Sequence, residues 1–179
     1  MTMKAKILLI IVSSFLLLSL KPACAQSAGE KYKSGLGAVK DGNEDYAYLY
    51  FLSIARDNPG SKYRPLALFA CGEYYFYKSD YEDAFNTFSE FIEDYPDSRI
   101  KPYAVFFLLK IARSWQKEEL VKTIEKEIRD MKQVILVFKE TKEYRYKYRS
   151  LLGRKYKLVY HIDRVEFNAD GEILEQVFY

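Results

Sequence analysis

Residues 47–67 read AYLYFLSIARDNPGSKYRPLA, and residues 84–104, which lie 37 positions later, read AFNTFSEFIEDYPDSRIKPYA. Self-similarity at a fixed spacing of roughly 20–50 residues is the signature of stacked supersecondary units. Because such stacks generally serve as binding surfaces, the two stretches predict a helical repeat module that binds a partner. The identical positions are Ala47/Ala84, Phe51/Phe88, Asp57/Asp94, Pro59/Pro96, Ser61/Ser98, Pro65/Pro102 and Ala67/Ala104.

Proline, glycine and asparagine divide the region around this repeat into helices. Pro65 and Pro102 fit the first turn of a helix, where the missing N–H of proline costs nothing. Asn58-Pro59-Gly60 stops a helix because proline cannot donate the next helical hydrogen bond. Asp41-Gly42-Asn43 suits a turn with positive φ. The expected helices are therefore 31–40, 45–56, 66–77, 81–94 and 103–114.

The repeat fades after residue 114, and two other patterns follow it. Apolar residues spaced by three and four over 116–140 predict one long amphipathic helix, which would cap the last apolar face of the stack. Segments 157–167 and 172–179 are rich in Val, Ile, Tyr and Phe, and Asp170-Gly171 lies between them, which predicts a β-hairpin. The expected fold is mainly α: about two and a half helical pairs, a long capping helix and a C-terminal β-hairpin packed alongside.

The first 25 residues have the pattern of an export signal. Lys4 and Lys6 precede a mostly apolar core at 7–20, and Ala23-Cys24-Ala25 forms an A-x-A cleavage site. The core is shorter than the roughly 20 residues that span a membrane, although a retained anchor is an alternative reading. Cys24 leaves a second alternative open, in which a lipid attached to this cysteine would hold the protein at the outer membrane.

Charge and cysteine usage limit the classes of function. Without residues 1–25 the chain has 25 basic and 25 acidic side chains, so no net positive charge favours nucleic acid. Residues 26–100 carry 8 basic and 13 acidic groups, whereas 101–179 carry 17 and 12. Cys71 alone would remain after cleavage, which excludes an internal disulfide. We expect one exported domain, with helices and cap at 26–141 and a basic segment and hairpin at 142–179.

Seven residues of the second helical pair, from Leu68 to Pro96, have the spacing of a known repeat motif. Through them the pair resembles a tetratricopeptide repeat. The period is 37 residues rather than 34, because the connection between pairs is longer. That connection, with YPDS after an aromatic helix, is similar to the BamD family of outer-membrane assembly lipoproteins and to the Tol-Pal-associated YbgF family. The resemblance implies a protein-binding stack of the periplasm and cell envelope. It rests on Leu68, Cys71, Gly72, Tyr75, Ala84, Phe88 and Pro96.

In tetratricopeptide proteins the first helix of each pair faces inward and lines a peptide-binding groove. Carried over by register, this implies a groove of aromatic and charged side chains that would hold an extended or helical peptide. The alternative is that the same aromatic residues pack under the capping helix or the hairpin, since apolar residues at helical spacing are usually core. The groove residues would be Tyr32, Leu36, Phe69, Glu73, Phe76, Tyr77, Tyr103, Phe106, Lys110 and Arg113.

Residues 139–157, KETKEYRYKYRSLLGRKYK, form a basic segment with eight basic residues, two acidic ones and four tyrosines. Export argues against RNA as its ligand. Anionic lipid headgroups or an acidic protein surface are candidate partners. The other reading is a solvated basic end of the long helix followed by a linker.

Motifs for catalysis, metals and cofactors are missing from the sequence. His161 is the one histidine, with no cluster of ligands around it, and Cys71 lies in an apolar stretch without a basic neighbour. No glycine-rich phosphate loop, H-E-x-x-H or G-x-S-x-G motif is present. We therefore expect a non-enzymatic scaffold or adaptor that binds another envelope protein. The alternatives are a membrane-surface protein that acts through the basic segment, and an unrecognised envelope enzyme.

Overall fold

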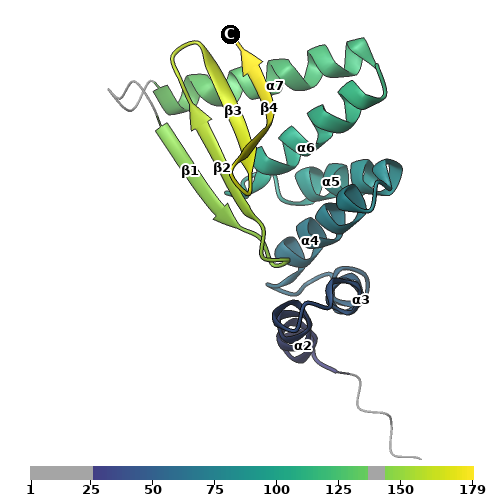
Figure 1. Cartoon of the computed structure of the whole chain (residues 1–179). Coiled ribbons are helices and arrows are strands. Elements are labelled where there is room, and N and C mark those ends of the chain that lie inside the picture. Colours follow the sequence, from purple (N-terminus) through teal and green to yellow (C-terminus); the bar gives the residue numbers. More distant parts are fainter. Residues whose placement is uncertain (1–25, 137–143) are drawn as a thin grey trace, which may run out of the picture.

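A computed structural model describes residues 26–136 and 144–179 of this 179-residue chain. The predicted export signal with Cys24 and residues 137–143 lie outside the described residues. Helices come first and a sheet follows, so the fold is mainly helical, as predicted (Figure 1). The helices are α2 (Ala28–Lys40), α3 (Glu44–Asp57), α4 (Arg64–Tyr77), α5 (Tyr81–Asp94), α6 (Lys101–Ser114) and α7 (Glu118–Leu136). The strands are β1 (Tyr144–Arg149), β2 (Lys155–Tyr160), β3 (Arg164–Ala169) and β4 (Glu172–Phe178).

The helices follow the 37-residue spacing of the sequence. Helices α3, α5 and α7 begin at residues 44, 81 and 118, and α4 and α6 begin at 64 and 101. Each helix packs against the next one in the chain. The predicted long helix after residue 116 is confirmed as α7, and it begins 37 residues after α5.

A change in side-chain volume explains why the sequence repeat fades although the helices continue. In the second pair Gly72 on α4 packs against Phe88 on α5. The positions 37 residues later hold Leu109, which is buried, and Glu125, which pairs with Arg113. The glycine–phenylalanine contact is therefore replaced here by a leucine and a charged residue.

The glycine contact of the second pair also occurs in the first pair. A Cβ atom placed on Gly35 would lie 2.6 Å from Phe51 Cε1, and one placed on Gly72 would lie 2.9 Å from Phe88 Cε1. Both phenylalanine side chains are completely buried. Glycine is needed at these two positions because the facing ring occupies the space of a Cβ.

The predicted β-hairpin is part of a larger sheet. All four strands pair antiparallel in the order β1-β2-β3-β4. The expected first strand, 157–167, is divided into the end of β2, a turn at 161–163 and the start of β3. The expected turn at Asp170-Gly171 is confirmed, since both residues have positive φ and Ala169 pairs with Glu172.

The basic segment also differs from its predicted structure. Its described part forms β1, a turn and the start of β2, so the reading of this part as a helix end and linker is wrong. The turn closes with Gly153 at φ 89°, and Arg149 pairs with Lys155 across it. The sheet edge formed by β1 is therefore made almost entirely of tyrosine, lysine and arginine.

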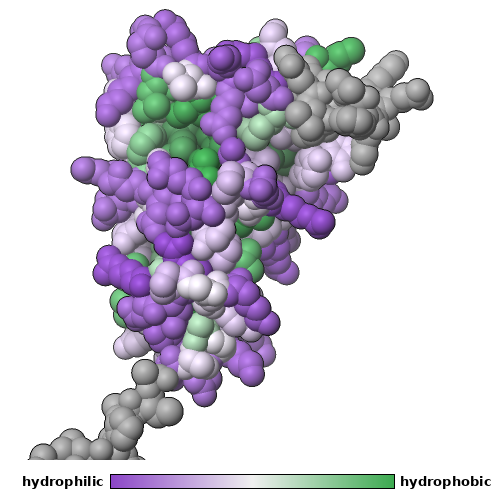
Figure 2. All heavy atoms as spheres, turned by 180° about the vertical axis from the view of Figure 1, so that it is seen from behind, coloured by the Kyte–Doolittle hydropathy of each residue, from purple (hydrophilic) through white to green (hydrophobic). Residues whose placement is uncertain are grey.

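The sheet lies across one side of the helices, against α4 and α6, whereas α2 projects beyond it (Figure 1). Aromatic rings fill the space between the two layers. The ring centroid of Phe107 on α6 lies 5.3 Å from that of Phe167 on β3 and 5.6 Å from that of Tyr156 on β2. Figure 2 shows the opposite side, where hydrophilic side chains predominate and an apolar cluster lies in the upper part.

We predict opposite effects for glycine substitutions in helices α2 and α4. Gly35→Ala and Gly72→Ala should each lower the free energy of unfolding by roughly 1–3 kcal/mol, because the new methyl group overpacks against a buried ring. Gly37→Ala should raise it by about 0.5–1 kcal/mol, since nothing lies within 4 Å of a Cβ there. Urea unfolding of the three variants measures these changes. Equal stability of Gly35→Ala and Gly37→Ala would contradict the close contact.

Candidate functional site

The predicted peptide groove is occupied by the sheet of the same chain. Phe69, Tyr103 and Phe106 on α4 and α6 are almost fully buried. The ring of Phe69 lies 5.4 Å from that of Tyr148, and the rings of Tyr103 and Phe106 lie 6.2 and 5.5 Å from that of Phe167. Phe76 is buried as well. These four residues do not line an open groove. The first three pack against the C-terminal strands, as the alternative reading describes, and Phe76 packs against Phe107 on α6.

The charged members of the predicted groove bind the sheet through ion pairs. Arg113 pairs with Glu175 on β4 and, through Nη2 at 2.7 Å, with Glu125 on α7. Lys110 Nζ lies 3.7 Å from the other oxygen of Glu175. Burial raises the pKa of Glu175, and Arg113 and Lys110 oppose that effect. Lys110 and Arg113 therefore attach β4 to α6 instead of facing a ligand.

The two groove residues of the first pair lie apart from the others. Tyr32 stacks on Tyr63, with ring centroids 4.4 Å apart, and Leu36 is exposed. Both belong to α2, which the sheet does not cover (Figure 1). The structure thus brings together the predicted groove residues of α4 and α6, but as an interior surface.

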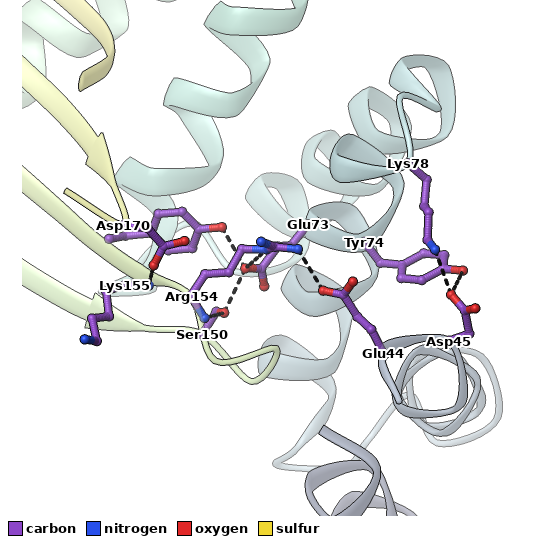
Figure 3. Close-up of polar contacts among 10 residues, drawn as sticks. Glu44, Asp45, Glu73, Tyr74, Lys78, Ser150, Arg154, Lys155 and Asp170 are labelled. Carbon is purple, nitrogen blue, oxygen red and sulfur yellow. Dashed lines mark hydrogen bonds and ion pairs between the residues drawn. The ribbon is translucent and has the colours of Figure 1, made fainter. Parts of the chain in front are cut away.

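Glu73 on α4 is the centre of a buried polar network (Figure 3). Its Oε1 accepts hydrogen bonds from Tyr156 Oη at 2.6 Å and Ser150 Oγ at 2.8 Å. Arg154 Nε lies 3.5 Å from the same oxygen, and Arg154 Nη2 donates to Glu44 Oε1 at 2.8 Å. The β1–β2 turn is thereby joined to α4 and to the start of α3.

The environment of Glu73 favours its neutral form. Complete burial raises the pKa of the carboxyl group to about 7, although hydrogen bonds from Tyr156 and Ser150 and the charge of Arg154 lower it. Oε2 has no hydrogen-bond partner within the described part of the chain. The Arg154 guanidinium also lies 3.6 Å from the ring centroid of Tyr77, so the remaining groove residue belongs to this network too.

We predict that Glu73 makes the protein less stable as the pH rises. The pKa is about 7 in the folded protein, against an ordinary value of 4.5 for a glutamate, so the folded state binds the proton more tightly. The stabilisation is complete below pH 4.5 and is lost as the pH rises through 7. At 1.36 kcal/mol per pKa unit, the loss is roughly 3 kcal/mol.

Urea unfolding between pH 4 and 8 measures this effect when wild type is compared with Glu73→Gln. The amide keeps the shape of the side chain but does not titrate, so the difference between the two curves isolates Glu73. Parallel curves would show that the carboxyl group is not perturbed.

We predict that Phe69→Ala destabilises the fold by about 3–5 kcal/mol, because it removes a buried ring that contacts both layers. Leu49→Ala on α3 is the control: its side chain is exposed, and the change should stay within about 0.5 kcal/mol. Chemical denaturation followed by circular dichroism gives both values. A stable Phe69→Ala protein would show that this face is not the core.

The side of β1 and β2 that faces away from the helices carries a row of cations. Strand alternation places the tyrosines of β1 against the helices and its basic residues on the outer face. Lys147 pairs with Lys157 and Arg149 with Lys155, so like charges lie directly opposite each other, which is destabilising. We call this set the basic row; it consists of Arg145, Lys147, Arg149, Lys155 and Lys157.

A hollow of about 450 Å³ lies on the basic row. The side chains of Lys147, Lys155 and Lys157 form no ion pair with any residue that the structure describes. Asn168 on β3 also lines the hollow, is 95% buried, and has an Nδ2 group without a hydrogen-bond partner among the described residues. The hollow thus presents several cations and an unused amide donor, all of which suit an anionic oxygen.

We did not predict from the sequence that Lys155, Asn168 and the strand β1 form one surface. A signal was available, because residues 144–149, YRYKYR, alternate strictly between tyrosine and a cation. Such alternation is typical of a strand with two different faces. The position of Asn168 depends on the pairing of β2 with β3, which no local pattern specifies.

The remaining candidates for chemistry have structural neighbours. His161 Nε2 lies 3.3 Å from Glu166, and burial raises the pKa of Cys71 to about 12. The acidic residues Glu90 and Asp94 near the end of α5 both pair with Arg64. Within residues 26–136 and 144–179, no group of three or more His, Cys, Asp or Glu side chains is placed to hold a metal ion.

None of the helices in the described residues has the length and apolar character needed to cross a membrane. Comparison with protein-family models and with curated proteins found no match to this sequence.

Proposed function

We propose that the protein is a non-enzymatic scaffold of the cell envelope that binds an extended, acidic segment of another protein along strand β1. The single observation that carries this proposal is the basic row beside an edge strand. Within the described residues β1 pairs only with β2, so its other edge has no strand beside it. A peptide can add to such an edge through main-chain hydrogen bonds, and its side chains then provide specificity.

Charge complementarity favours an acidic occupant. The carboxylates of an added strand would lie beside Lys147 and Arg149 and over the hollow that holds Asn168. An unpaired, buried amide donor costs about 1–3 kcal/mol, so an acceptor oxygen supplied by a partner would recover that energy. The repulsion between Lys147 and Lys157 would also decrease when an anion lies close to them.

Charges on an edge strand can also serve to prevent aggregation, since they repel another edge. That effect explains why a second copy of β1, which carries the same cations, is not the favoured partner. It does not exclude a strand of opposite charge. The same residues can therefore disfavour self-pairing and select an acidic segment.

The helical part of the proposal is a short tetratricopeptide-like stack. It is supported by the 37-residue spacing of the helix starts and by the glycine–phenylalanine contact that occurs in two pairs. Ion pairs follow the same spacing, since Arg64 pairs with Glu90 and Lys101 with Glu127. In this protein the binding surface is proposed to lie on the added sheet, because the inward face of the stack is covered.

We predict that a fluorescent peptide of alternating Glu and Val binds the protein, and that the double variant Lys147→Glu/Lys157→Glu weakens this binding at least tenfold at low salt. The two introduced glutamates repel the carboxylates of the peptide. A tenfold change in the dissociation constant corresponds to about 1.4 kcal/mol of binding free energy. Fluorescence anisotropy measures the affinity. Hydrogen exchange should also show protection of those amides at 146–149 that do not bond to β2.

The matched control is Lys33→Glu/Lys126→Glu, which changes the net charge equally at two exposed positions on α2 and α7. It should bind like wild type. A peptide of alternating Lys and Val should not bind. Equal loss in both double variants, or binding without protection of β1, would overturn strand addition as the mode of binding.

A second candidate function is association with an anionic membrane surface, because the basic row would also attract lipid headgroups. Sedimentation with vesicles that contain anionic lipid distinguishes the two. Vesicle binding that depends on Lys147 and Lys157, without any binding of the Glu/Val peptide, would favour the membrane.

A further inference from the structure

A cavity of about 740 Å³ lies on the other side of β1, between the sheet and the start of α6. Pockets for small ligands have volumes of about 300–1,000 Å³ and are mostly apolar with a few convergent polar groups. The exposed cations Arg99 and Lys147 also border the cavity. Its wall is formed mainly by Ile100, Tyr103, Tyr146, Tyr148, Leu158 and Tyr160. We call it the tyrosine pocket.

Three hydroxyl groups of this wall have no hydrogen-bond partner among residues 26–136 and 144–179. They belong to Tyr103, Tyr148 and Tyr160, and all three oxygens are buried. Buried tyrosine hydroxyls usually find a partner, and each one left unpaired costs about 1–3 kcal/mol. Burial raises the pKa of all three hydroxyls, so they stay protonated and can donate. Three such groups around one cavity indicate a binding partner with polar atoms.

The wall restricts the chemistry of that partner. A purely aliphatic group would cover Ile100 and Leu158 but leave the hydroxyls unpaired. A strongly hydrated group would pair with the hydroxyls but leave the apolar wall uncovered. A side chain with an aromatic body and a polar tip satisfies both, and tyrosine and tryptophan have this form.

We propose that the tyrosine pocket is the anchor site for tyrosine or tryptophan side chains of the segment that adds to β1. This inference rests on the proposed function. In an added strand, alternate side chains lie about 6.7 Å apart on the same face. Those on the inner face continue the row of Tyr144, Tyr146 and Tyr148 and enter the pocket, while those on the outer face meet the basic row. The favoured segment alternates aromatic and acidic residues.

Four peptides test the inference by NMR titration and fluorescence anisotropy on the whole protein: EYDYEYD, EFDFEFD, ESDSESD and KYKYKYK. The first should bind at least tenfold more tightly than the serine peptide, because only its inner side chains fill the pocket. The lysine peptide should not bind, since the basic row repels it. Resonances of Leu158 and Ile100 should shift with the first peptide and not with the serine peptide.

The protein variant Tyr103→Phe/Tyr160→Phe tests the hydroxyls without changing the shape of the wall. Removal of an unpaired hydroxyl should leave stability equal or higher. Affinity for EYDYEYD should fall about five- to tenfold, as expected for a lost hydrogen bond, while affinity for EFDFEFD should stay the same. Tyr46→Phe, at an exposed position on α3, is the control and should bind like wild type.

The outcomes separate this inference from the proposed function. Equal affinity for the tyrosine and serine peptides would overturn the anchor site and leave strand addition intact. Equal loss of both aromatic peptides in the double Phe variant would overturn the role of the hydroxyls. Failure of all three acidic peptides to bind at millimolar concentration would overturn both proposals.

Discussion

The burial of one aromatic face under the sheet is the constraint on which the rest of the structure depends. Helices α4 and α6 both turn phenylalanine or tyrosine rings toward the strands, and rings of β1, β2 and β3 meet them. In an open helical stack each unit contacts only its neighbours. Here the sheet packs on two successive pairs at once, and Glu73 and Glu175 bind it to α4 and α6 by polar contacts. The surfaces that we propose for a partner therefore lie on the sheet and between its β1 edge and the start of α6.

Much of the helical part could be predicted because its signals are local. Proline and glycine divide the helices, and the predicted bounds of α5, 81–94, agree with the structure. The Asp170-Gly171 turn was also predictable, since few residues adopt positive φ easily. The sequence similarity fades at α6 and α7 because Leu109 and Glu125 replace the glycine and phenylalanine of the earlier helices, while the backbone spacing stays the same. The break between β2 and β3 was missed because His161-Ile162-Asp163 contains neither glycine nor proline.

The candidate site could be predicted from the sequence only in part, and for a different reason. Register correctly grouped Phe69, Glu73, Tyr103 and Phe106 on one face. Solvent exposure of that face depends on a sheet whose residues lie far away in the sequence. Helical periodicity is the same for a face that the protein itself covers and for a face that binds a ligand. The basic row and the tyrosine pocket arise from pairing between β1 and β2 and from packing on α6. These are long-range contacts that composition alone does not specify.

The order of the elements along the chain has a consequence for synthesis. The strands that cover Phe69 and Phe106 follow all the described helices in the chain, so they are synthesised after those helices. Until then the aromatic face of α4 and α6 has no cover, and such exposed apolar surface favours association between nascent chains. Completion of the fold also requires contacts between distant residues, for example Glu73 with Tyr156, and contacts of this kind slow folding. A chaperone that binds aromatic helical surfaces would therefore act on this protein before the sheet is added, and loss of the last strands would leave that surface permanently open.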